Sequence, residues 1–156
     1  MASFRTTHTQ TLSTTANQTV IVNHGGSASV RCHLYEIELG SVVGGGNPVV
    51  DAAEIALRAS TAAGSGGTNL DEVNTNPPGA AAVVACTGGN HTTDPTTAAS
   101  GNFKLITLRK ELPWKWQGYP GREIISVPAA GGGLALVTIS IVGTAFAAKA
   151  STAWLE

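Results

Sequence analysis

The chain has 156 residues, of which 42% are hydrophobic and 12% are charged, and its formal net charge is -1. This composition disfavours intrinsic disorder, because the chain has enough apolar side chains to form a core. It also disfavours a nucleic-acid partner, because binding to phosphates requires clustered Lys and Arg side chains. The length predicts one domain.

The first 18 residues are polar and rich in threonine, and they contain almost no large apolar side chain. We therefore predict an extended N-terminal arm over residues 1–18 and a folded domain over residues 19–156. Phe4 and Arg5 are the residues of this arm that we expect to contact a partner. A segment of this kind can become ordered when it docks.

After the arm, short apolar segments alternate with clusters of Gly, Pro, Asn and Thr. This spacing is typical of all-β sandwiches and barrels. We predict a single-domain antiparallel β-sandwich with a jelly-roll-like topology. Glycine- and proline-rich breaks are expected at residues 44–48 and 77–78. The predicted strands cover residues 19–23, 29–39, 103–110, 123–127, 134–142 and 145–155.

The predicted strand at 29–39 has two mixed faces. Cys32, Leu34 and Glu36 alternate with His33, Tyr35 and Ile37, so each face is partly apolar and partly polar. Such a pattern predicts a strand that passes from a buried core to a second contact surface.

Residues 51–60 fit two kinds of secondary structure. An acidic residue followed three positions later by Glu54, and then by an alanine-rich run, is typical of a helix N-terminus. The same stretch alternates Ile55 and Leu57 with Ala56 and Arg58, which is typical of a strand. We favour a strand from about Glu54. Residues 80–85 are predicted to form one helical turn, and residues 87–101 a polar loop.

The uncharged stretch 131–148 approaches the length of a membrane-spanning helix. Thr138, Ser140 and Gly143 interrupt it, and its apolar residues alternate. We therefore predict two buried strands there and no membrane association. The two cysteines, Cys32 and Cys86, are too few for a disulfide framework, so we expect both thiols to be reduced and buried.

The sequence contains no recognisable catalytic or metal-binding motif. His24 and His33 are nine residues apart, and neither is part of a zinc-binding motif. A nucleophile elbow and a phosphate-binding loop are also absent. We therefore predict no enzyme activity, no cofactor and no metal. A hydrolase using His91 and Asp94 is the weakest alternative.

An aromatic segment at residues 113–121 is the strongest candidate for a binding site. Trp114 and Trp116 are two residues apart, so in an extended segment they share one side. Lys115 then points to the other side, and Tyr119 is close by. The tryptophans can anchor a protein partner, stack on sugar rings, or close one end of the core.

Three segments resemble small virion proteins of tailed bacteriophages. These are residues 31–40 (RCHLYEIELG), residues 58–64 (RASTAAG) and residues 120–124 (PGREI). In that group a strand, a Gly-Ser and Pro break, a second strand with Arg-x-Ser/Thr-Ala-Ala-Gly, and a later Pro-Gly-x-Glu-Ile step recur in this order.

The resemblance implies a β-sandwich capsid cement or decoration protein, often a homotrimer, without catalytic residues. Such a protein would be made in the host cytoplasm and would lie on the outer capsid surface. Its partners would be the major capsid protein and copies of itself. We expect Phe4, Arg5, Trp114, Trp116 and Tyr119 to make these contacts. A carbohydrate-binding or tail-associated module for host attachment is the alternative.

Overall fold

The computed structural model describes residues 2–13, 18–25, 30–42, 51–75, 79, 81–89, 91–126 and 132–156. All the regular elements in these ranges are strands, which confirms the all-β prediction. The strands are β1 (Ser3–Leu12), β2 (Thr19–Gly25), β3 (His33–Ser41), β4 (Ala52–Ala62), β5 (Thr68–Asn69), β6 (Val73–Asn74), β7 (Val84–Gly88), β8 (Thr96–Arg109), β9 (Trp114–Gln117), β10 (Ile124–Ile125), β11 (Gly133–Val142) and β12 (Phe146–Leu155).

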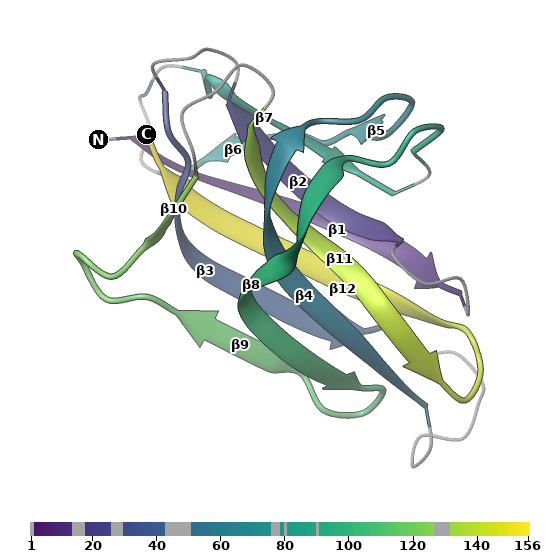
Figure 1. Ribbon diagram of the computed structural model, residues 1–156. Coiled ribbons are helices and arrows are strands. Elements are labelled where there is room, and N and C mark those ends of the chain that lie inside the picture. Colours follow the sequence, from purple (N-terminus) through teal and green to yellow (C-terminus); the bar gives the residue numbers. More distant parts are fainter. Residues whose placement is uncertain are drawn as a thin grey trace.

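Two antiparallel sheets pack face to face, as predicted for a β-sandwich (Figure 1). The first sheet has the order β10-β3-β12-β1-β6, and β9 pairs with β3 on the same edge as β10. The second sheet has the order β5-β7-β2-β11-β4-β8. The central order is therefore β9-β3-β12-β1 against β8-β4-β11-β2. In chain order these eight strands alternate between the two sheets, except for β4 and β8, which pair with each other. This is a jelly-roll arrangement.

The core lies between the two sheets and is completed by the last strand. The inward face of β12 is buried along its whole length, as its alternating sequence predicts. Small alanines in the middle of this face allow the sheets to approach closely, and aromatic rings fill its two ends. The residues of this face are Phe146, Ala148, Ala150, Thr152 and Trp154.

The predicted N-terminal arm is wrong, because β1 is an inner strand of the first sheet. It pairs with β12 in register from Ser3↔Leu155 to Leu12↔Phe146, and with β6 on its other side. Its threonines favour extended backbone, and alternate positions carry the few apolar side chains into the core. Phe4 and Leu12 are fully buried there. Residues 1 and 14–17 of the predicted arm lie outside the described residues.

The mixed faces of β3 have a simpler explanation than the predicted second contact surface. A β-bulge opposite Ala153 and Trp154 adds one residue to β3, at Tyr35. The bulge shifts the side-chain alternation, so Leu34 and Ile37 both point into the same core. The strand keeps one buried apolar face, and Glu36 and Glu38 lie on the other.

The ambiguous stretch 51–60 belongs to a strand, β4 (Ala52–Ala62), as favoured from the alternation. The helical turn predicted at 80–85 is wrong, because β7 begins at Val84. The loop predicted at 87–101 is too long: β7 extends to Gly88 and β8 begins at Thr96, so only the part between them lies outside the strands. Val84 and Cys86 alternate into the core, a pattern that the surrounding alanines conceal in the sequence. The predicted breaks at 44–48 and 77–78 lie outside the described residues.

Two further predictions concern the stretch 131–148 and the cysteines. The described part of 131–148 belongs to β11, a turn and β12, and within the described residues no helix is long and apolar enough to span a membrane. Cys32 and Cys86 are free and buried, as predicted. Burial raises the pKa of both thiols.

Candidate interaction site

The aromatic segment forms an edge strand rather than a loop. β9 pairs with β3 through Ile37↔Trp116 and Leu39↔Trp114, so both tryptophans lie on the core side of the sheet. They are half-buried and pack against the core, while Lys115 points to the outer face. The prediction that the two tryptophans share one side is therefore confirmed. Both rings also close the margin of the sandwich.

A tight turn projects from this edge between β9 and β10. The backbone N–H of Arg122 donates to the carbonyl of Tyr119 at 2.8 Å, and Gly121 has a φ of 80°. Proline at the second position and a glycine of positive φ at the third are the features of a type II turn. Glu123 accepts a hydrogen bond from the Gly121 N–H at 3.0 Å. The turn therefore holds the exposed Tyr119 and Arg122 side by side.

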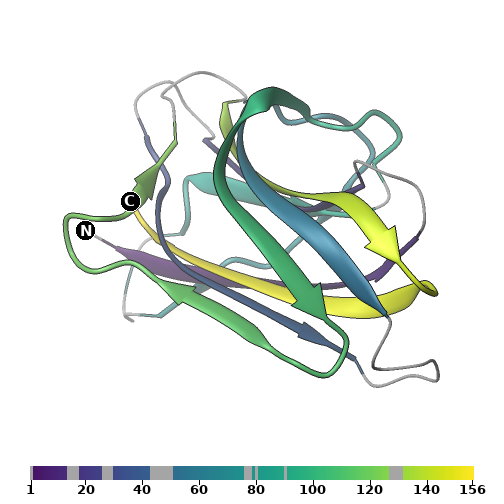
Figure 2. The same cartoon turned by 60° about the horizontal axis from the view of Figure 1, so that its bottom comes forward.

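The space between this turn and β8 is a shallow groove of about 380 Å³, which we call the aromatic groove. β8 belongs to the other sheet, and a short turn joins it to β9 at the same margin of the sandwich (Figure 2). Lys104 of β8 places its Nζ 5.2 Å from the centre of the Trp116 ring, a cation–π contact between the two sheets. The groove is lined mainly by Phe103, Lys104, Trp116, Tyr119, Arg122 and Ile124.

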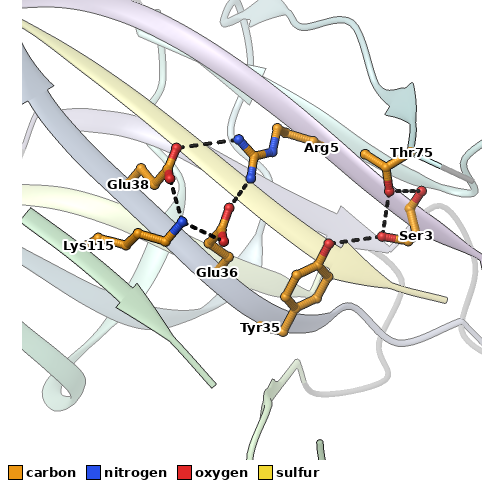
Figure 3. Close-up of polar contacts among 7 residues, drawn as sticks. All are labelled: Ser3, Arg5, Tyr35, Glu36, Glu38, Thr75 and Lys115. Atoms are coloured by element: carbon orange, nitrogen blue, oxygen red, sulfur yellow. Dashed lines mark hydrogen bonds and ion pairs between the residues drawn. The ribbon is translucent and has the colours of Figure 1, made fainter. Parts of the chain in front are cut away.

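A second feature, the ion-pair cluster, lies on the outer face of the first sheet and consists of Arg5, Glu36, Glu38 and Lys115 (Figure 3). Arg5 reaches from β1 across β12 to Glu36 and Glu38 of β3. Lys115 of β9 contacts the same two carboxylates at 2.9 and 2.7 Å. The side chains of β12 beneath the cluster are small, Ser151 and Ala153, and both are buried. The cluster therefore joins three strands over a shallow floor.

Electrostatics in the cluster favour the charged forms. The hydrogen bond from Lys115, followed by the charges of Lys115 and Arg5, lowers the pKa of Glu38. The hydrogen bonds to Glu38 and Glu36 raise the pKa of Lys115. Beside the cluster, Ser3 shares hydrogen bonds with Tyr35 at 2.9 Å and Thr75 at 2.7 Å. These contacts tie the start of β1 to its neighbours (Figure 3).

The outer face of the first sheet also has a groove of about 480 Å³ next to the ion-pair cluster. The residues that line it include Gly40, Trp114, Lys115 and Lys149. A Cβ atom added to Gly40 would meet nothing within 4 Å, so this part of the surface is open.

The structure separates the predicted contact residues into two groups. Trp116 and Tyr119 line the aromatic groove, whereas Trp114 packs against the core and borders the groove on the outer face. Phe4 is 1% exposed and its ring stacks on Trp154 with centroids 5.9 Å apart, so the prediction that it contacts a partner is wrong. Arg5 is partly exposed, but its guanidinium is engaged by Glu36 and Glu38.

The histidines do not form a catalytic constellation in the described part of the chain. His24 and His91 line a small cleft of about 200 Å³ under a glycine-rich loop. His91 Nε2 lies 3.2 Å from the Thr87 hydroxyl, whereas Asp94 accepts a hydrogen bond from Thr19. Among the described residues, no three His, Cys, Asp or Glu side chains could hold a metal ion together.

The sequence analysis did not predict the two groove residues that lie outside the 113–121 segment on β8, Phe103 and Lys104. Phe103 and Lys104 are on a strand of the other sheet, and only the pairing of Lys104 with Leu57 shows that it points toward the tryptophan margin. It also missed the ion-pair cluster. The one signal in the sequence was the pair of acidic residues, Glu36 and Glu38, on one face of a predicted strand.

Comparisons with known proteins give no relative for this chain: no family model, no curated protein and no solved structure matches it.

Proposed function

We propose that this chain is a non-enzymatic structural subunit of a bacteriophage virion. In this role it is a capsid cement or decoration protein, lies on the outer surface of the head, and binds the major capsid protein and copies of itself in a trimer. The resemblance of residues 31–40, 58–64 and 120–124 to small virion proteins supports this proposal. The first segment contains most of β3, the second the end of β4, and the third the turn before β10.

The observation that carries the proposal is the margin formed by β8 and β9. In the described part of the chain each strand is paired on one side only, β8 with β4 and β9 with β3. Unpaired sheet edges and exposed apolar side chains are sites where another chain can bind. The exposed apolar residues along this margin are Phe103, Leu105, Leu112, Tyr119 and Ile125.

Fold alone does not choose between functions, because jelly rolls occur in viral capsids and in lectin domains. The low charge of the chain favours a subunit that is packed against neighbours. Many identical copies on a lattice make weak individual contacts effective.

The test compares virions that contain the chain with virions from which it has been deleted. We expect particles without it to rupture at a lower temperature and at a lower chelator concentration, and added purified protein to restore the resistance. Equal resistance of the two particles would contradict a cement role. Light scattering on the purified chain tests the trimer, and a monomer would contradict that part of the proposal.

A carbohydrate-binding or tail-associated role in host attachment is the second candidate, and the aromatic groove is the observation that favours it. Tyr119 is 79% exposed and Phe103 46%, so both rings are accessible for stacking on a sugar. A glycan array tests this role, with Tyr119→Ala as the variant expected to lose binding. Absence of any glycan signal would remove this candidate.

A further inference from the structure

The aromatic groove contains two cationic side chains whose charges are not neutralised by the described part of the chain. Lys104 rests over the Trp116 ring, and no ion pair forms at its Nζ among the described residues. Arg122 is exposed at the end of the tight turn, and its side chain likewise forms no ion pair there. The groove therefore presents positive charge beside aromatic rings.

Most carboxylates of the chain are already engaged. All Asp and Glu residues lie in the described ranges. Only Asp71 and Glu111 have carboxylates that accept no hydrogen bond and form no ion pair within those ranges. Only Glu36, Glu38 and Asp51 form ion pairs among the described residues, and the other carboxylates keep their charge. Adjacent acidic residues occur in the sequence only at Asp71 and Glu72, so a second copy of this chain offers no extended acidic segment to the groove. The engaged residues are Glu36, Glu38, Asp51, Glu54, Glu72, Asp94, Glu123 and Glu156.

The groove is preorganised for binding. Pro120 and Gly121 fix the turn that carries Tyr119 and Arg122, so little backbone entropy is lost when a ligand binds there. Trp, Tyr and Arg are also the residues that contribute most to binding energy at protein interfaces.

The position of the groove favours a polypeptide over a sugar. It lies between β8 and the edge formed by β9 and β10, where main-chain groups have no partner strand on one side in the described part of the chain. An extended peptide can form main-chain hydrogen bonds with such an edge and place alternate side chains in the neighbouring pockets.

We propose that the aromatic groove binds an extended acidic polypeptide segment of a partner protein, with carboxylates of that segment contacting Lys104 and Arg122. That the partner belongs to a virion rests on the proposed function. That the groove binds an acidic segment rests only on the residues of the groove. Positive charge in the groove then selects the partner and accelerates the encounter.

Fluorescence anisotropy with a short labelled peptide of alternating Glu and Thr tests the proposal on the full chain. We expect binding that weakens with added salt, and no binding of a matched peptide in which Gln replaces Glu. Lys104→Gln with Arg122→Gln should weaken the binding roughly tenfold. Arg122→Gln alone changes an exposed turn residue and should give part of this loss without affecting folding.

The matched control is Arg31→Gln with Lys149→Gln, which removes one Arg and one Lys outside the groove and should leave the binding unchanged. An equal loss in this control would overturn the proposal, because net charge alone would then explain the binding. Equal binding of the Gln peptide would overturn the requirement for carboxylates. Tighter binding of polygalacturonate through Lys104 and Arg122 would assign the groove to acidic sugars instead.

Self-association through the same two cations, seen by sedimentation, would assign the groove to a second copy of the chain and overturn the proposal. Binding of the Glu peptide together with unchanged stability of virions lacking the chain would contradict the cement role only. The two proposals can therefore fail separately.

Discussion

Arg5 and Lys115 lie on opposite sides of β12, and both form ion pairs with the carboxylate of Glu36. Arg5 is near the start of β1, and Lys115 is on the edge strand β9, more than a hundred residues later in the chain. Glu36 is 7% exposed, so its charge is stabilised mainly by these two partners. The carboxylate thereby links the first described strand of the sheet to the margin that carries the aromatic groove.

Replacing Glu36 with Gln should destabilise the chain, because Arg5 and Lys115 would lose the carboxylate between them. Both cations are partly exposed, so water compensates some of the loss. We expect the free energy of unfolding to fall by about 1–2 kcal/mol. Urea denaturation followed by circular dichroism measures this change.

Glu111→Gln is the matched control, because it removes the same charge from an exposed position at which the carboxylate has no partner in the described part of the chain. Its unfolding curve should overlay that of the parent chain. Similar curves for Glu36→Gln and Glu111→Gln would show that the ion-pair cluster adds no stability.

The strands with regular alternation could be predicted from sequence, and the residues that depend on pairing could not. The face of β12 from Phe146 to Trp154 is recognisable because its period of two is unbroken. The period of β3 is broken at Tyr35 by a bulge, and a bulge is a property of the pair of strands rather than of either one. The sequence therefore predicts this strand but not which of its side chains are buried.

The candidate site divides in the same way. Trp114, Trp116 and Tyr119 are close in sequence and could be predicted as a group. Lys104 joins them only because the jelly roll brings β8 and β9 to one margin, a contact between sheets that local patterns do not encode. The N-terminal strand was mistaken for an arm for another reason. β1 buries few large apolar side chains, so its hydrophobic pattern is weak, and it is held in the sheet by its pairing with β12.

Deleting residues 1–12 should prevent folding, because β1 is an inner strand and its removal would expose β12 and the ring of Trp154. Phe4→Ala tests the same point with one side chain and should cost about 3–5 kcal/mol. Thr9→Ala, on the exposed face of β1, is the control and should cost less than about 1 kcal/mol. A folded, stable deletion variant would restore the interpretation of this segment as an arm.

Gly88 should not tolerate a side chain. A Cβ atom there would lie 2.7 Å from the ring of His8, which packs over β7 from the facing sheet. We expect Gly88→Ala to lower the free energy of unfolding by about 1–3 kcal/mol through this overlap. Gly40→Ala is the matched control in a strand, because its Cβ would meet nothing within 4 Å. Equal urea midpoints for the two variants would contradict the packing of His8 on β7.

Stability should decrease as the pH falls below neutrality, because the fold partly buries three histidines and so favours their neutral form. Burial lowers the pKa of His8, His24 and His91 below the ordinary value of 6.5. Below that value the unfolded chain binds more protons than the folded chain, so protonation favours unfolding.

Glu38 acts in a lower pH range. Hydrogen bonding to Lys115 lowers the pKa of Glu38, and the contribution of Glu38 to stability is lost only below the usual value of 4.5. The two effects thus occupy separate pH ranges.

The measurement is a series of urea denaturations between about pH 7.5 and 5.5. The parent chain should lose stability mainly below the ordinary histidine pKa of 6.5, and a His24→Gln, His91→Gln double variant should lose less. His91 contacts the Thr87 hydroxyl, a contact that a Gln amide can also make, so the variant keeps a polar side chain in the cleft. A parent chain equally stable at both ends of the range would contradict the preference of these partly buried histidines for the neutral form.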